Sequence, residues 1–134
     1  MRSRPPWFYR QSAVIPYRST GAGVEILLVT SSGGKRWIIP KGIIDRGMTP
    51  LESACKEAFE EAGVRGRPGA TPRGQYRYKK WGGICTVEVF TLEVTALLDE
   101  WPESDIRRRE WMSAKDAVVA IEEAGLKRLI RSML

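Results

Sequence analysis

The segment 49–64 contains the signals for both ends of a single helix. Thr49 and Glu52 have the spacing of a capping box, in which the threonine side chain accepts from the backbone N–H of Glu52 while the glutamate reaches back to Thr49. Pro50 stands at the first helical position, where its missing N–H costs nothing. Gly63 fits the left-handed position that follows the last helical turn. We therefore expect a helix between these two signals.

This helix has two chemically different faces. Apolar side chains recur at helical spacing, which places them on one stripe facing a core; they are Leu51, Ala54, Cys55, Ala58, Phe59 and Ala62. Glu57, Glu60 and Glu61 share an arc of about 100° on the other side. Like charges at this spacing repel by roughly a few tenths of a kcal/mol per pair, so a positive group should offset them. Lys56 is one candidate, and a hard divalent cation that prefers oxygen ligands is the other.

The residues upstream of the helix decide between a binding site and a plain surface. Taken alone, the three glutamates favour a solvated acidic face. However, the segment 37–39 has the composition of a short strand, and the segment 40–42 that of a tight loop. A strand–loop–helix unit brings the carbonyl and N–H groups of the loop beside the carboxylates, and this arrangement favours a binding site.

The segment 37–64, WIIPKGIIDRGMTPLESACKEAFEEAGV, resembles the Nudix box. The pattern of that box is G-x5-E-x7-R-E-U-x-E-E-x-G-U, where U is a bulky aliphatic residue. The matching residues are Gly42, Glu57, Glu60, Glu61, Gly63 and Val64, with the small Ala58 at the first U position. Two positions depart from the pattern, because Met48 replaces its first glutamate and Lys56 replaces its arginine.

The resemblance extends beyond the box. The strings EILLVTSS, KRWIIPKG and RRREWMSAKDA are similar to the diphosphoinositol polyphosphate phosphohydrolase subgroup of that family. The similar region therefore runs from about Arg10 to Ala120 and covers most of the chain.

The length and residue patterns predict one domain over 1–134, with residues 1–8 as a loose N-terminal arm. The expected elements are strands at 9–17, 24–30, 37–39, 75–81, 84–95 and 107–112, a loop at 65–73, a helix from Ser113 ended by Gly125, and a short helix at 126–134. Strands and helices in this order suggest a mixed sheet between helical layers. This is the α/β/α sandwich that the resemblance implies.

The composition narrows the chemistry. The chain has no histidine, which excludes His-ligated zinc and Ser-His or Cys-His catalysis. Its net charge of +6 suggests an anionic partner. There is neither an apolar run of membrane-spanning length nor the apolar core of a secretory signal. Cys55 and Cys85 are expected to be buried free thiols, which is consistent with a reducing, cytoplasmic location.

The resemblance implies a hydrolase that cleaves a phosphoanhydride bond with Mg²⁺ or Mn²⁺. The negative charge of such a bond repels a nucleophile, so the enzyme needs cations at the phosphates and a base for the attacking water. By their places in the motif, Glu57, Glu60 and Glu61 are the implied metal ligands, and the backbone carbonyl of Lys41 is a further one. Glu60 is also the implied catalytic base. Lys56 is the implied catalytic residue that orients a glutamate, although lysine lacks the planar fork of arginine.

Five residues are expected to contact the substrate. Arg10, Ser31 and Ser32 occupy places that resemble phosphate contacts of the inositol-directed subgroup, and we add Lys41 and one arginine of the 107–109 run, for which we choose Arg109. The expected substrate is an anionic phosphorylated small molecule, either a diphosphoinositol polyphosphate-like compound or a nucleoside or dinucleoside polyphosphate. Three further carboxylates that could approach the metals are Glu88, Glu93 and Glu103.

Another class of function stays open at this point. Met48, Lys56 and the positive charge also fit a Nudix-fold module that binds nucleic acid or regulates, and that is catalytically weak. Basic and aromatic residues alternate over 75–81, which could stack a base but fits a half-buried strand equally well. We favour the hydrolase, and expect a monomer or homodimer with no membrane and no nucleic-acid partner.

Overall fold

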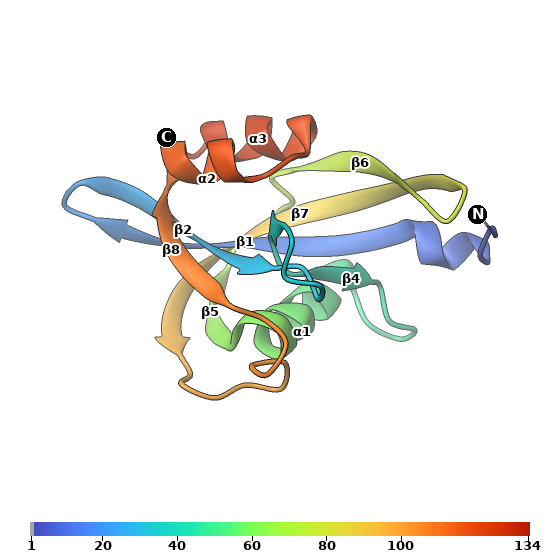
Figure 1. Ribbon diagram of the computed structural model, residues 1–134, viewed down its shortest axis with the longest axis horizontal. Coiled ribbons are helices and arrows are strands. Elements are labelled where there is room, and N and C mark those ends of the chain that lie inside the picture. Colours follow the sequence, from blue (N-terminus) through green and yellow to red (C-terminus); the bar gives the residue numbers. More distant parts are fainter. Residues whose placement is uncertain (1) are drawn as a thin grey trace.

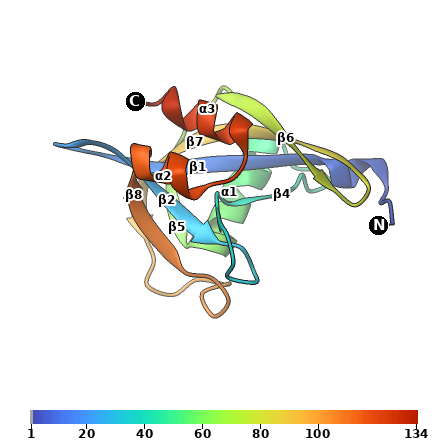
Figure 2. The same cartoon turned by 45° about the horizontal axis from the view of Figure 1, so that its top comes forward.

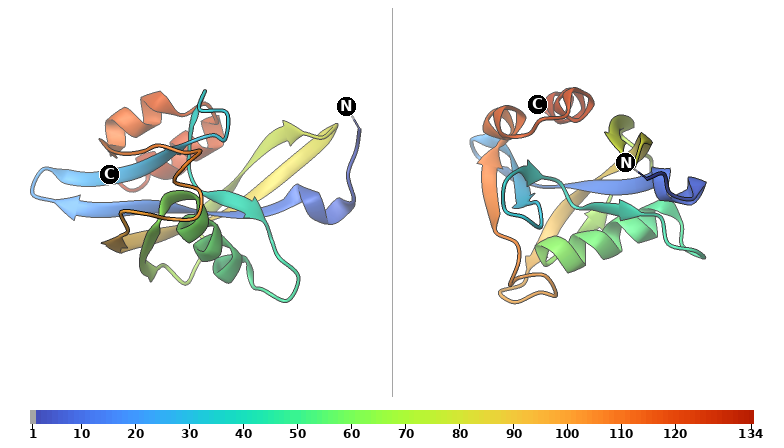
Figure 3. Two further views of the ribbon diagram at one scale, coloured as in Figure 1. Left: turned by 60° about the horizontal axis from the view of Figure 1, so that its bottom comes forward. Right: turned by 45° about the vertical axis from the view of Figure 1, so that its right-hand side comes forward.

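The computed structural model describes residues 2–134 as three layers (Figure 1). A mixed sheet lies in the middle, with α1 on one face and α2 and α3 on the other, as Figure 3 shows most clearly. The elements are the 3-10 helix η1 (Pro6–Tyr9), β1 (Arg10–Thr20), β2 (Gly23–Thr30), β3 (Trp37–Ile38), β4 (Lys41–Ile43), α1 (Pro50–Ala62), β5 (Val64–Pro68), β6 (Gly74–Lys80), β7 (Gly83–Leu97), β8 (Arg109–Ser113), α2 (Ala114–Ala120) and α3 (Ala124–Arg131). The predicted α/β/α sandwich with a mixed sheet is confirmed.

Strand β1 organises the sheet. It runs parallel to β7 along one edge and antiparallel to two different strands along the other edge. Its first part pairs with β4, from Gln11 opposite Ile43 to Ala13 opposite Lys41. Its last part pairs with β2, from Tyr17 opposite Ile26 onward. The remaining strands join the sheet through β2 and β7: β3 and β8 pair with β2, and β5 and β6 pair with β7.

Side-chain alternation along β1 divides the core into two halves. Ala13 and Ile15 belong to the half that also contains side chains of α2 and α3. Figure 2 shows these two helices lying over the sheet. Val14 belongs to the half under α1, together with Ala54 and Ala58 of that helix. Both alanines are fully buried, so their small side chains let α1 lie close to the sheet.

Helix α1 has the ends that the sequence predicts. The Thr49 hydroxyl accepts from the Glu52 N–H at 3.1 Å, and the Glu52 carboxylate accepts from the Thr49 N–H at 2.9 Å. Gly63 follows the helix at φ +65°, and its N–H donates to the Phe59 carbonyl. Within residues 2–134, no helix combines the length and the apolar character that crossing a membrane requires.

Two predicted loops are wrong, because parts of them pair as strands. Lys41 and Gly42 of the expected tight loop 40–42 belong with Ile43 to β4, which is held by β1. The segment 64–68 at the start of the other loop is β5, which pairs with β7 across an irregularity between Arg65 and Gly66. Neither segment is rich in the β-branched residues that favour a strand. Each one forms a strand because a neighbouring strand offers hydrogen-bond partners.

The two termini differ from the prediction as well. Residues 6–8 of the expected loose arm form η1 together with Tyr9, and η1 packs against β1, β4 and β7. Gly125 does not end a helix but lies in the first turn of α3, because α2 already ends at Ala120. A Cβ on Gly125 would lie 2.7 Å from the Tyr76 Cβ, so glycine allows α3 to approach β6 closely. Cys55 and Cys85 are free thiols, as predicted, and Cys85 is the more buried.

Candidate active site

Two glutamates one turn apart on α1 form the centre of the site. The carboxyl groups of Glu57 and Glu61 lie close enough to influence each other's pKa; Glu61 is 5% exposed and Glu57 is half-buried. Burial raises the pKa of the Glu61 carboxyl to about 8, with Arg107 opposing the shift and Glu57 adding to it. Burial also raises the pKa of Glu57, while the side chain of Glu61 lowers it. Two neighbouring carboxyls, one of them buried, are stabilised by a shared proton or by a cation between them.

Strand β4 holds this pair from the sheet side. The Lys41 N–H donates to Glu61 Oε1 at 3.3 Å. The neighbouring Gly42 has no side chain, and a Cβ there would lie 2.6 Å from the Glu57 carboxyl carbon. Gly42 is therefore the residue that lets the Glu57 carboxyl lie against the backbone. The strand that the sequence did not predict is the one that positions both carboxyls.

Arg107 closes the other side of Glu61. Its guanidinium lies 3.7 Å from Glu61 Oε2, donates from Nε to Glu103 at 2.8 Å, and donates from Nη1 to the Thr30 carbonyl at 2.8 Å. The side chain of Arg107 is only 11% exposed. The backbone also links this segment to α1, since the Glu103 N–H donates to the Glu60 carbonyl.

Lys56 pairs with Glu60 and with Asp45, not with the Glu57–Glu61 pair. Lys56 Nζ lies 2.9 Å from Asp45 Oδ2 and 3.6 Å from Glu60 Oε2. The hydrogen bond with Asp45 and then the charge of Glu60 raise the pKa of Lys56. The three predicted glutamates therefore divide into a pair, the half-buried Glu57 with the buried Glu61, and a half-buried Glu60 that is paired with lysine.

The donor set fits a magnesium or manganese ion. In the part of the chain described, no three histidine, cysteine, aspartate or glutamate side chains come together as a preformed cluster. Magnesium is usually held by one or two carboxylates, with waters and substrate phosphates completing its six positions. Glu57 and Glu61 supply such a pair. The buried Ser12 hydroxyl, opposite Gly42 in the β1–β4 register, has no partner within residues 2–134 and is a further polar atom on this side.

The predicted substrate-binding residues lie in several places. Arg10 is exposed at the start of β1, and alternation puts it on the α1 face with Val14. The Ser31 hydroxyl accepts from the Arg36 N–H at 3.3 Å, within the turn after β2, where Ser32 is exposed. The Lys41 ammonium lies 5.0 Å from the centre of the Tyr78 ring, and burial lowers its pKa.

Arg109 has contacts unlike those expected of a substrate ligand. Its guanidinium donates to the carbonyls of Ala62 and Leu98 and lies 3.9 Å from the centre of the Trp101 ring. These contacts join the C-terminal end of α1 to the 98–101 segment. Of the 107–109 run, Arg107 is the arginine beside the carboxylates.

The comparison with known families agrees with this geometry. A model described as "NUDIX domain" matches residues 8–133. The chain therefore belongs to the Nudix family. The resemblance to the diphosphoinositol polyphosphate phosphohydrolases is confirmed by the relatives that follow.

Among similar proteins, "Nudix hydrolase 12, mitochondrial" of Arabidopsis thaliana is 32% identical over 119 residues, which cover 83% of this chain and 59% of that protein. "Diphosphoinositol polyphosphate phosphohydrolase 3-alpha" of Mus musculus is 36% identical over 121 residues, covering 88% of this chain and 72% of that protein. The chain thus spans less than two thirds of the first relative's length.

Two solved structures share the fold. An Ap4A hydrolase of C. elegans superimposes with a TM-score of 0.73 and 21% identity, over 92% of this chain and 93% of that one. A Nudix hydrolase from Nitrosomonas europaea gives a TM-score of 0.73 and 16% identity, over 92% and 86%. At these identities the likeness concerns the fold.

Proposed function

We propose that this protein is a Mg²⁺- or Mn²⁺-dependent hydrolase that cleaves the phosphoanhydride bond of a phosphorylated small molecule. The observation that carries the proposal is the pairing of two carboxyls one helical turn apart, the half-buried Glu57 and the buried Glu61, with Glu61 beside the Arg107 guanidinium. Placing two carboxyls side by side, one of them buried, is unfavourable without a positive partner. A fold that keeps them together is therefore suited to a bound cation.

In this proposal each residue has a stated task. Glu57 and Glu61 hold the divalent ion, which supplies positive charge at the phosphate oxygens. The Lys41 N–H and the Arg107 guanidinium fix the orientation of Glu61. Glu60, which is more exposed than Glu61, accepts the proton of the attacking water.

The remaining assignments support the same reaction. The Lys41 carbonyl is a further candidate ligand of the ion. Lys56 orients Glu60, since its ammonium lies 3.6 Å from that carboxylate and is itself held by Asp45. Arg10, Ser31 and Ser32 are the proposed phosphate contacts, and Lys41 and Arg109 complete the set predicted from the sequence. Because Arg109 already donates to two carbonyls, Arg107 is the better candidate of the two arginines for a contact near the phosphate.

The names of the relatives define which substrates to test. One relative is named a diphosphoinositol polyphosphate phosphohydrolase, and one solved neighbour an Ap4A hydrolase. The experiment is release of phosphate or nucleotide from inositol pyrophosphates, nucleoside polyphosphates and dinucleoside polyphosphates, each with Mg²⁺, with Mn²⁺ and with chelator. We expect turnover with a metal and none with chelator.

The alternative is a catalytically weak nucleic-acid-binding or regulatory module. It is favoured by Met48, which is 38% exposed and brings no carboxylate to the site. In that case no substrate of the panel is cleaved, and the protein binds polynucleotides with an affinity that falls steeply with salt. We retain cytoplasmic location and a monomeric or dimeric state as predictions; the plant relative's name specifies mitochondria.

A further inference from the structure

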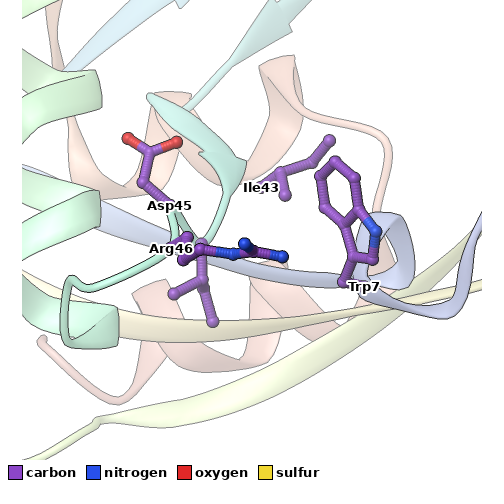
Figure 4. Close-up of a pocket in the computed structure, with 5 residues that line it drawn as sticks. Trp7, Ile43, Asp45 and Arg46 are labelled. Atoms are coloured by element: carbon purple, nitrogen blue, oxygen red, sulfur yellow. The ribbon is translucent and has the colours of Figure 1, made fainter.

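A pocket of about 540 Å³ lies next to the site, outside the residues assigned so far. It is lined by Trp7, Ile43, Ile44, Asp45 and Arg46 (Figure 4). Trp7 belongs to η1, and the other four follow one another after Gly42 at the end of β4. The N-terminal segment and the loop before α1 therefore build this pocket together.

Trp7 is unusual for a side chain of its size because it is 59% exposed. One side of its indole is supported by Phe8, at 4.4 Å between ring centres, and Phe8 packs edge-on against Trp81 at 5.2 Å. The indole is thus held in place while much of its surface stays uncovered. A supported and exposed indole is a stacking platform for another flat ring.

The charges around the pocket favour an anionic ligand. The Arg46 side chain is exposed and extends toward Trp7, whereas the Asp45 carboxylate points away from the indole (Figure 4). Asp45 is already paired with Lys56 at 2.9 Å. The free charge at the mouth of the pocket is therefore the positive charge of Arg46.

The pocket lies close to the glutamates of α1. Asp45, which lines the pocket, pairs with Lys56 at 2.9 Å, and Lys56 lies 3.6 Å from Glu60. Ile44 lies two residues beyond Gly42, against which the Glu57 carboxyl packs. A ligand with a flat ring in the pocket would therefore place an attached phosphate chain near these carboxylates.

We propose that the Trp7–Arg46 pocket binds the nucleobase of a nucleoside or dinucleoside polyphosphate, and so selects nucleotides as substrates. A base offers a flat ring to the indole and apolar edges to Ile43 and Ile44. An inositol ring is puckered and carries a polar group on every carbon, so it has no face that matches these residues. This inference rests on the proposed hydrolase function for the phosphate end of the ligand.

The test separates ring binding from catalysis. In chelator, NMR titration measures the affinity for the four common nucleoside 5′-monophosphates, with ribose 5-phosphate as the probe that lacks a base. Trp7→Ala should weaken binding of the preferred nucleotide roughly tenfold or more, and leave ribose 5-phosphate unchanged. Trp7→Phe should retain most of the affinity because it keeps a ring. Val119→Ala, at a side chain 79% exposed on α2, is the surface control and should change nothing.

The kinetic arm uses the nucleotide that turns over fastest, with Mg²⁺. There Trp7→Ala should raise KM roughly tenfold with little change in kcat, since the ring does not touch the reacting phosphate. If no nucleotide binds better than ribose 5-phosphate, or if Trp7→Ala weakens both probes equally, the pocket assignment is overturned. Failure of the hydrolase proposal gives a different result, namely base-dependent binding in chelator without turnover of any substrate.

Discussion

The Arg107 guanidinium lies 3.7 Å from the Glu61 carboxylate and, on its other side, 2.8 Å from that of Glu103. One buried cation is therefore shared between a glutamate of the motif and a glutamate far along the chain. Arg107 is thereby fixed at the edge of the carboxylate pair, and the segment that carries it closes over the C-terminal half of α1. Four predictions follow from this arrangement and from the contacts around it.

Replacing Glu57 by Gln should lower kcat roughly a hundredfold or more, because the pair loses one of its two anionic oxygen donors. The fold should remain, since glutamine fits the same space and removes a repulsive charge. Steady-state kinetics with Mg²⁺ measures the first effect and circular dichroism the second. Glu52→Gln is the matched control on the same helix, because glutamine also serves in a capping box. Equal activity of the two variants would rule out Glu57 as a ligand.

Arg107→Gln should destabilise the protein by about 3 kcal/mol, because it leaves Glu61 and Glu103 without their buried partner. The free energy of unfolding from urea titration gives this value. Double substitution with Glu103→Gln should recover part of the loss, which a simple packing defect at Arg107 would not do. Additive losses in the double variant would contradict the shared ion pair.

Gly42→Ala should reduce activity while most of the stability remains. The new methyl group would occupy space 2.6 Å from the Glu57 carboxyl carbon, so the flexible carboxyl must move from its place beside Glu61. We expect weaker Mg²⁺ activation, measured as a higher metal concentration at half-maximal rate. Gly21→Ala, in the β1–β2 turn with open space around it, is the control and should behave as the parent protein. An unchanged metal dependence in Gly42→Ala would refute this role.

The stability of the metal-free protein should fall as pH rises from about 5 to 8. The pKa of the Glu61 carboxyl, ordinarily 4.5, is raised to about 8, so the folded state holds its proton more tightly than the unfolded chain does. The resulting stabilisation is complete below the ordinary pKa and is lost as pH passes through the raised one. Thermal unfolding in chelator at several pH values measures this slope. Glu61→Gln should flatten it; a slope of the same size in that variant would assign it to other groups.

Local signals made α1 predictable. The capping pair Thr49–Glu52 and the left-handed Gly63 act within a few residues of chain, so the sequence alone defines the helix ends and the order of its glutamates. Strands β4 and β5 have no such signal. Lys41-Gly42-Ile43 becomes a strand because β1 offers hydrogen-bond partners, and that neighbour is about thirty residues away in the chain.

The candidate site was also predictable only where local spacing defines it. The spacing of Glu57, Glu60 and Glu61 indicates a common arc but not that Glu61 is buried while Glu60 pairs with Lys56. The choice between Arg107 and Arg109 could not be made from sequence, because Arg107 precedes β8 in an irregular segment with no regular alternation of sides. The sequence pattern predicts a loose arm around Trp7, whereas its place beside Arg46 depends on η1 packing against β4.

One edge of β1 pairs first with β4 and then with β2, and this division affects which parts of the chain can change their residues without disturbing the sheet. At the division the chain passes from β3 to β4 through Pro40, whose carbonyl accepts from the Val14 N–H at 3.3 Å. Beyond that anchor, the strand register of β4 with β1 ends at Ile43, and the exposed residues 46–48 lead into α1. The side chains of Arg46 and Met48 can therefore be exchanged while the strands and α1 keep their positions. New ligand preferences can arise by altering this short connector, with the carboxylates of α1 left in place.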